Sequence, residues 1–163
     1  MNIWPVFLKL ILAIILGGAI GVERETSHKP AGFRTHILIC ISSATMMILA
    51  QLLSGGSLGA DSSRVVAGVI TGVGFLGAGT ILQARGTVHG LTTASTIWAV
   101  AGLGLVIGAG YYLVAVLFTG LVVLTLVLFR KIEFSLIRKF EKNYPAERSN
   151  DHDRDRAADG FRK

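Results

Sequence analysis

Five apolar segments alternate with short polar ones along this chain. They cover residues 3–22, 37–53, 64–82, 91–109 and 113–129, and each approaches the roughly 20 residues needed to cross the hydrocarbon core of a bilayer. Between Asp61 and Glu133 the sequence contains no acidic residue at all. The pattern predicts an all-α integral membrane protein, folded as a small bundle of about five transmembrane helices.

The third apolar segment, Arg64 to Leu82, is rich in glycine. In a soluble helix each glycine costs about 1 kcal/mol relative to alanine, whereas in lipid small residues let helix backbones approach closely. We therefore expect this helix to be buried against other helices. The glycines predicted to form helix-packing contacts, here and in the first segment, are Gly17, Gly21, Gly68, Gly72, Gly74, Gly77 and Gly79.

The spacing Gly72-x-Gly74-x-x-Gly77 also matches a dinucleotide-binding fingerprint. That motif needs a preceding strand and an acidic residue about 20 positions further on, to hold a ribose. No acidic residue follows before Glu133, so the pattern favours helix packing over nucleotide binding.

The basic residues predict the orientation of the bundle. The net charge is +6, and the basic side chains gather in the first loop, the third loop and the segment after the fifth helix. Because basic residues collect in cytoplasmic loops, we expect the N-terminus outside and the C-terminus in the cytoplasm. Residues 1–5 lack a basic residue, and no small-residue cleavage site follows, so the first helix is expected to be retained. Within it, Lys9 either extends to the membrane interface or faces a polar cavity.

Three regions follow from these patterns: a transmembrane domain over residues 1–130, then residues 131–144, then a tail. Residues 131–144 place apolar side chains on one helical face beside basic ones. This is typical of a juxtamembrane amphipathic helix, although a frayed extension of the fifth span gives the same pattern. Residues 145–163 are charged and poor in apolar residues, so we expect a disordered tail.

Polar residues near the membrane are predicted to converge on the cytoplasmic side. We expect Glu23 or Glu25 to pair with Arg34 or Arg85, because charges at a membrane edge need partners; ordinary solvated loop charges are the alternative. The predicted functional polar cluster consists of Glu23, Arg24, Glu25, Arg34, Thr35, Arg85, Thr92 and Thr93.

Catalytic and cofactor chemistry finds little support in the sequence. The histidines lack zinc-like spacing, Cys40 is the only cysteine, and no serine lies in a nucleophile elbow. If a divalent cation binds, its candidate ligands are Glu23, Glu25 and Asp61, but no carboxylate lies along the spans. Aromatic residues do not alternate with basic ones as a nucleic-acid surface requires. We predict a protein that is not an enzyme and has no cofactor, no metal and no nucleic-acid partner.

Several motifs together give a family resemblance. They are Gly21-Val-Glu-Arg-Glu25, Pro30-Ala-Gly-Phe-Arg-Thr35, residues 61–64, the glycine-rich run 72–81 and residues 90–98. Over residues 17–104 the chain resembles the MgtC/SapB family of bacterial membrane proteins. The resemblance implies a bundle of about five transmembrane helices in the bacterial inner membrane, and a link to growth at low magnesium. Two positions depart from the best-known members, which have asparagine in place of Thr92 and cysteine in place of Ala99. The sequence also shows no counterpart of the soluble C-terminal domain that those members carry, which weakens the case for virulence-type regulation.

Two functions remain open at this point. The first is a non-enzymatic regulator in adaptation to low magnesium, acting through transmembrane helix contacts as a homo-oligomer in the lipid bilayer. The resemblance adds other membrane proteins, such as the F-type ATP synthase, as its partners. The second is a transporter or channel for magnesium or another cation, with Lys9, Glu23, Glu25 and Asp61 as its polar groups.

Overall fold

The computed structural model describes residues 3–55, 60–84 and 87–143, and of these the side chains of residues 60–61, 84 and 133–143 are not described. The chain divides into two compact units, Met1–Leu126 and Val127–Lys163. Its elements, in order, are α1 (Trp4–Thr26), α2 (Phe33–Leu53), α3 (Ala60–Gly79), β1 (Leu82–Ala84), β2 (Thr87–His89), α4 (Leu91–Ala109) and α5 (Tyr112–Asn143).

All five helices are long and apolar enough to cross a membrane. The prediction of an all-α membrane bundle is therefore confirmed, and α4 has the predicted bounds. The first two helices are longer than predicted. Residues 23–26 belong to α1 and residues 33–36 to α2, so the connection between these helices is shorter than the polar sequence indicated.

The first unit is built around α2, which packs mainly against α4 and α1. The buried core contains small and branched apolar side chains, among them Ala13, Cys40, Ala44, Val100 and Leu103. Cys40 is fully buried, as expected of a small apolar residue.

Glycines let α2 approach both neighbours. A Cβ at Gly17 would lie 2.7 Å from the Cβ of Cys40, and one at Gly21 would lie 2.8 Å from the Cα of Phe33. On the other side, a Cβ at Gly108 would lie 2.6 Å from the carbonyl oxygen of Ala44. These separations leave no room for a side chain, so the small residues set the distances between the helix axes.

The glycine-rich helix α3 is packed differently. It contacts α4 and α2, yet much of its surface is exposed. A Cβ at Gly77 would meet Ala94 of α4 at ordinary contact distance, whereas Gly68, Gly72, Gly74 and Gly79 have nothing within 4 Å of that position. Within this chain, α3 is therefore buried against other helices over only part of its length, and burial of the remainder against another copy stays a prediction.

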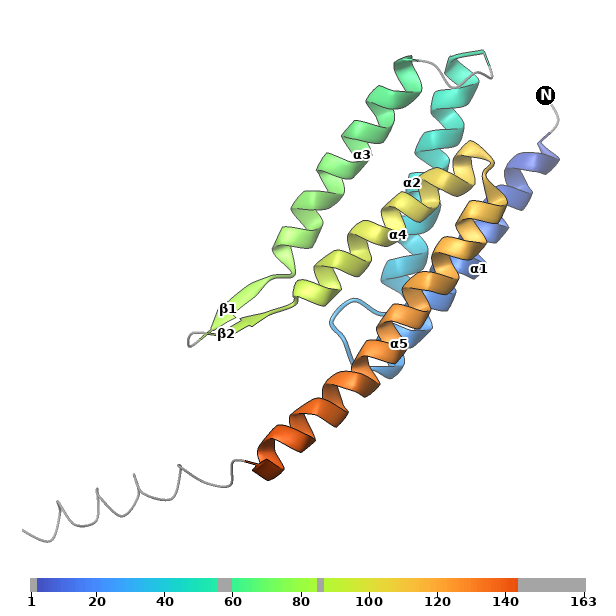
Figure 1. Ribbon diagram of the computed structural model, residues 1–163. Helices are drawn as coiled ribbons and strands as arrows, with labels where there is room; N and C mark the ends of the chain where they lie inside the picture. The colour runs from blue at the N-terminus through green and yellow to red at the C-terminus, as the bar shows by residue number, and fades with distance from the viewer. Residues whose placement is uncertain (1–2, 56–59, 85–86, 144–163) are drawn as a thin grey trace, which may run out of the picture. The chain divides into compact units, whose positions relative to one another are not determined.

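A short antiparallel hairpin joins α3 to α4, where the sequence analysis expected only a polar connection. Leu82 pairs with His89 and Ala84 with Thr87. Gly90 follows with φ +91°, and a Cβ there would strike the carbonyl oxygen of Thr80, so only glycine fits the junction. The hairpin lies at the same end of the first unit as the connection between α1 and α2 (Figure 1).

In the second unit the helix continues from Val127 to Asn143 as part of α5. No new helix begins at residue 131. Whether residues 131–143 lie along a membrane surface stays a prediction, and the predicted tail, residues 145–163, falls outside the described residues.

Candidate functional site

The buried charges of the first unit lie at the C-terminal end of α1. Glu23 and Arg24 are 8% and 2% exposed, and they form an ion pair with each other. The second carboxylate oxygen of Glu23 accepts a hydrogen bond from the Ser27 hydroxyl at 2.8 Å. Burial makes the loss of either partner costly, because the other charge would be left buried without compensation.

His36 completes this buried group from α2. Its ring is fully buried, and Nδ1 lies 2.8 Å from the carbonyl oxygen of Gly32, so Nδ1 carries the proton and donates. Nε2 has no hydrogen-bond partner among the described residues. The charges of Glu23 and Arg24 are close enough to act electrostatically on the ring. In the sequence, His36 is only one of the histidines without zinc-like spacing, and no motif predicts its burial beside the charge pair.

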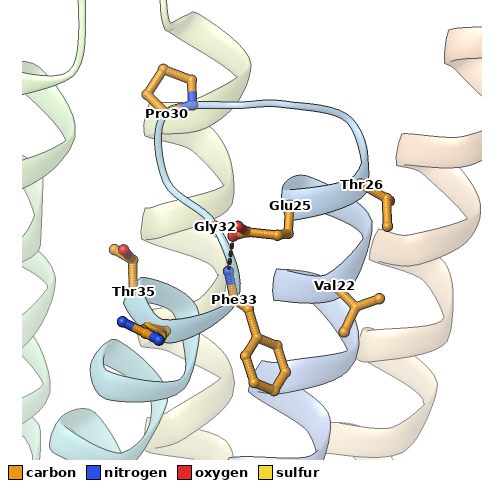
Figure 2. Close-up of a pocket in the computed structure, with 8 residues that line it drawn as sticks. Val22, Glu25, Thr26, Pro30, Gly32, Phe33 and Thr35 are labelled. Carbon is orange, nitrogen blue, oxygen red and sulfur yellow. Dashed lines mark hydrogen bonds between the residues drawn. The ribbon is translucent and has the colours of Figure 1, made fainter.

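Glu25, the second acidic residue of the motif Gly21-Val-Glu-Arg-Glu25, has a different environment from Glu23. Glu25 is exposed, and its carboxylate accepts a hydrogen bond from the backbone N–H of Phe33 at 3.0 Å, across the loop between the helices (Figure 2). It thereby satisfies one of the unpaired N–H groups at the start of α2.

The predicted pairing of Glu23 or Glu25 with Arg34 is wrong. Arg34 is exposed and makes no ion pair with any described residue; together with Thr35 and Glu25 it lines an open cavity of about 730 Å³. Arg85 lies outside the described residues, so its pairing stays a prediction.

The two threonines of the cluster are separated on α4. Thr93 is buried. Thr92 is exposed and lines a groove of about 470 Å³ between α4 and α5, together with Ala99 and Phe118. The described members of the predicted cluster therefore lie in four places: the buried charge pair, the cavity at the loop, the groove that Thr92 lines, and the buried position of Thr93.

A further polar contact lies at the opposite end of the bundle. Lys9 of α1 donates hydrogen bonds to the carbonyl oxygen of Gly108 at 2.7 Å and to Oε1 of Gln51 at 3.3 Å. Gln51 in turn donates to the carbonyl oxygen of Ala109 at 3.3 Å. The ammonium group thus caps the C-terminal end of α4, where carbonyl groups lack helical partners.

Among the described residues no three His, Cys, Asp or Glu side chains come together as a metal site. Both oxygens of Glu23 are already engaged, and Oε2 of Glu25 accepts the Phe33 N–H. The side chain of Asp61 is not described.

Comparison with known proteins identifies the family. The profile of the MgtC family matches residues 10–135, which is most of the chain. The chain belongs to the MgtC family. It is accordingly a multi-pass protein of the bacterial inner membrane.

Its relatives include YhiD of Escherichia coli K12, named as a candidate magnesium transporter, with 45% identity over 81% of this chain and 64% of YhiD. Protein MgtC of Brucella abortus is 38% identical over 81% of this chain and 57% of its own length. Protein SrpB of Synechococcus elongatus is 42% identical over 77% of this chain and 75% of SrpB. The chain thus spans less than two thirds of YhiD and of Brucella MgtC. No solved structure matches it.

Proposed function

We propose that this chain is a non-enzymatic membrane regulator linked to magnesium homeostasis, and that it acts by associating with a second copy through α3. The names of its relatives supply the link to magnesium: YhiD is named as a candidate magnesium transporter. The same proposal includes binding of the associated copies to other membrane proteins, such as the F-type ATP synthase.

The exposed face of α3 is the observation that carries the proposal. The close contacts at Gly17, Gly21 and Gly108 are already used within the chain. On α3, by contrast, four glycines have no described residue within 4 Å of where a Cβ would lie, and Phe75, 82% exposed, projects from the same region. The exposed members of this face are Ala67, Gly68, Thr71, Gly72, Gly74, Phe75, Ala78 and Gly79.

Geometry favours association between copies over simple exposure to lipid. At about 100° per residue, these positions form one continuous side of the helix. Small residues on such a side let another backbone approach, and contacts of this kind stabilise helix pairs in membranes. This side also carries Arg64 near its start and has Leu76, 53% exposed, at its edge, but small residues surround Phe75 over most of its length. It can therefore pair with itself about a two-fold axis, with each Phe75 resting on the glycines of the other copy.

Substitution of one α3 glycine tests the proposal. Gly72→Leu is expected to remove most of the energy transfer between donor- and acceptor-labelled copies in liposomes, because the added side chain separates the backbones. Gly120→Leu is the matched control, since Gly120 on α5 is also exposed with nothing within 4 Å. Equal energy transfer in both variants would contradict association through α3. Gly77→Leu is less informative, because Gly77 already faces Ala94.

Growth at low magnesium connects association to regulation. In cells that depend on this protein, Gly72→Leu should fail to restore growth, and Gly120→Leu should restore it. If a Gly72→Leu variant no longer associates but still restores growth, association through α3 occurs but is not needed for the function in low magnesium.

A cation transporter is the second candidate, favoured by the name of YhiD. Purified protein in sealed liposomes, containing a fluorescent magnesium indicator, tests it directly. If magnesium flux is abolished by Glu23→Ala and unchanged in Gly120→Leu, the protein is a transporter and the regulator proposal is wrong.

A further inference from the structure

The cavity between the end of α1 and the start of α2 has a defined chemical character. It has a volume of about 730 Å³ and is lined by side chains that include Val22, Glu25, Thr26, Phe33, Arg34 and Thr35. Figure 2 shows these elements meeting beneath the loop that carries Pro30. Among the described residues of its lining, Glu25 and Arg34 are the charged ones, and they place one negative and one positive group at the cavity.

This pair of charges restricts what the cavity can bind. The carboxylate of Glu25 is held near the start of α2 by the N–H of Phe33, so a simple anion there would face a fixed negative charge. A simple cation would meet Arg34 in the same way. A ligand that carries both a phosphate and an ammonium group matches both side chains, and the hydroxyl group of Thr35 offers the phosphate a further donor.

Part of the remaining wall of the cavity is apolar and belongs to the membrane-spanning helices α1 and α2. Phe33 is 41% exposed and Val22 50% exposed. The Phe33 ring lies over Gly18 of α1, where a Cβ would come within 3.1 Å of it. An apolar surface that continues from a charged site into the spans suits a ligand with hydrocarbon chains.

We propose that this cavity binds the headgroup of a phosphoethanolamine lipid from the surrounding membrane. The lipid phosphate contacts Arg34 and Thr35, its ammonium group contacts Glu25, and an acyl chain lies along Phe33 and Val22. A choline headgroup cannot donate N–H hydrogen bonds to Glu25, and a glycerol headgroup carries no positive charge. The site is therefore selective for phosphatidylethanolamine. Binding of this lipid does not depend on whether the protein acts as a regulator or as a transporter.

Lipid retention during purification tests the assignment. Wild-type protein is reconstituted in nanodiscs with equal amounts of phosphatidylethanolamine, phosphatidylcholine and phosphatidylglycerol, extracted in mild detergent, and its bound lipid measured by native mass spectrometry. Phosphatidylethanolamine should be enriched about threefold, which is the scale of a partly exposed charge pair. Free phosphoethanolamine at millimolar concentration should not displace it, because it lacks the chains.

Three variants distinguish binding at this site from non-specific retention of lipid. Glu25→Gln should remove the preference for phosphatidylethanolamine over phosphatidylglycerol, while the glutamine oxygen still accepts the Phe33 N–H. Arg34→Gln should lower retention of both phospholipids. Lys29→Gln is the control, since Lys29 is exposed in the same loop but does not line the cavity. Equal retention of all three lipids by the wild type, displacement by free phosphoethanolamine, or an equal loss in Lys29→Gln would overturn the proposal.

Discussion

At the scale of single residues, Lys9 is a charge placed inside an apolar span for a structural reason. Its ammonium group contacts α4 and α2 from α1, so one side chain links three helices. The carbonyl groups at the end of α4 carry the negative end of the helix dipole and lack donors of their own. A cation at this point therefore stabilises the bundle, whereas a lysine directed only to water would not.

Lys9→Met is predicted to lower the free energy of unfolding by about 1–2 kcal/mol, because it leaves the Gly108 carbonyl and Gln51 without their donor. Equilibrium unfolding in mixed micelles, followed by circular dichroism, measures the change. A double-mutant cycle with Gln51→Leu should give a coupling energy, since the two side chains touch. Unchanged stability in Lys9→Met would mean that the ammonium group is solvated instead.

The buried pair of Glu23 and Arg24 illustrates the limit of sequence reasoning at this scale. The sequence predicts Arg34 or Arg85 as the partner of Glu23, and it predicts no partner for Arg24. Adjacent residues on a helix point about 100° apart, so their neighbourhood in the sequence does not predict that they pair. The side chains of Glu23 and Arg24 are long and flexible enough to reach each other despite this angle. The amino-acid sequence does not reveal which rotamers they adopt.

At the scale of helices, the contacts of α2 with α4 depend on small residues. A Cβ at Gly104 would strike the carbonyl oxygen of Cys40 and lie 2.8 Å from the Cβ of Ser43. Gly102, on the same helix, has nothing within 4 Å. The two positions differ by half a turn, so one faces α2 and the other does not.

Gly104→Ala is accordingly predicted to destabilise the protein by about 1–3 kcal/mol through overpacking. Gly102→Ala should be neutral or slightly stabilising, because alanine favours the helix more than glycine does. Thermal unfolding in the same detergent compares the two variants. Equal changes would show that α2 and α4 can separate at little cost.

Hydropathy predicted the existence of each helix, because a span needs only length and apolar composition. It could not say which helices pack closely. Gly17 and Gly72 look alike in sequence, yet one faces α2 and the other faces no residue of the described chain. The difference arises from tertiary contacts, which the apolar pattern does not encode when lipid and protein interior are equally apolar.

At the scale of the whole protein, the distribution of the basic residues predicts the membrane orientation. The loop end of the first unit carries Arg24, Lys29 and Arg34, and it is also the end of the β1–β2 hairpin, whose connecting residues include Arg85 in the sequence. The opposite end contains the turn between α4 and α5, at Gly110 and Tyr111, which has no charge. Because basic loops stay in the cytoplasm, the loop end is predicted to face inward.

Cysteine labelling tests this orientation, since Cys40 is the only native cysteine and is fully buried. In intact spheroplasts a membrane-impermeant maleimide should label Tyr111→Cys but not Lys29→Cys, and Lys29→Cys should react only after the membrane is broken. Both positions are exposed in the folded chain, so a lack of labelling reflects the membrane and not burial. The reverse pattern would place the cavity of Glu25 and Arg34 at the outer leaflet, and the ethanolamine lipid would then have to be drawn from that side. Labelling of both positions in intact spheroplasts would mean that the two ends of the bundle are not separated by a bilayer, and the membrane assignment itself would fail.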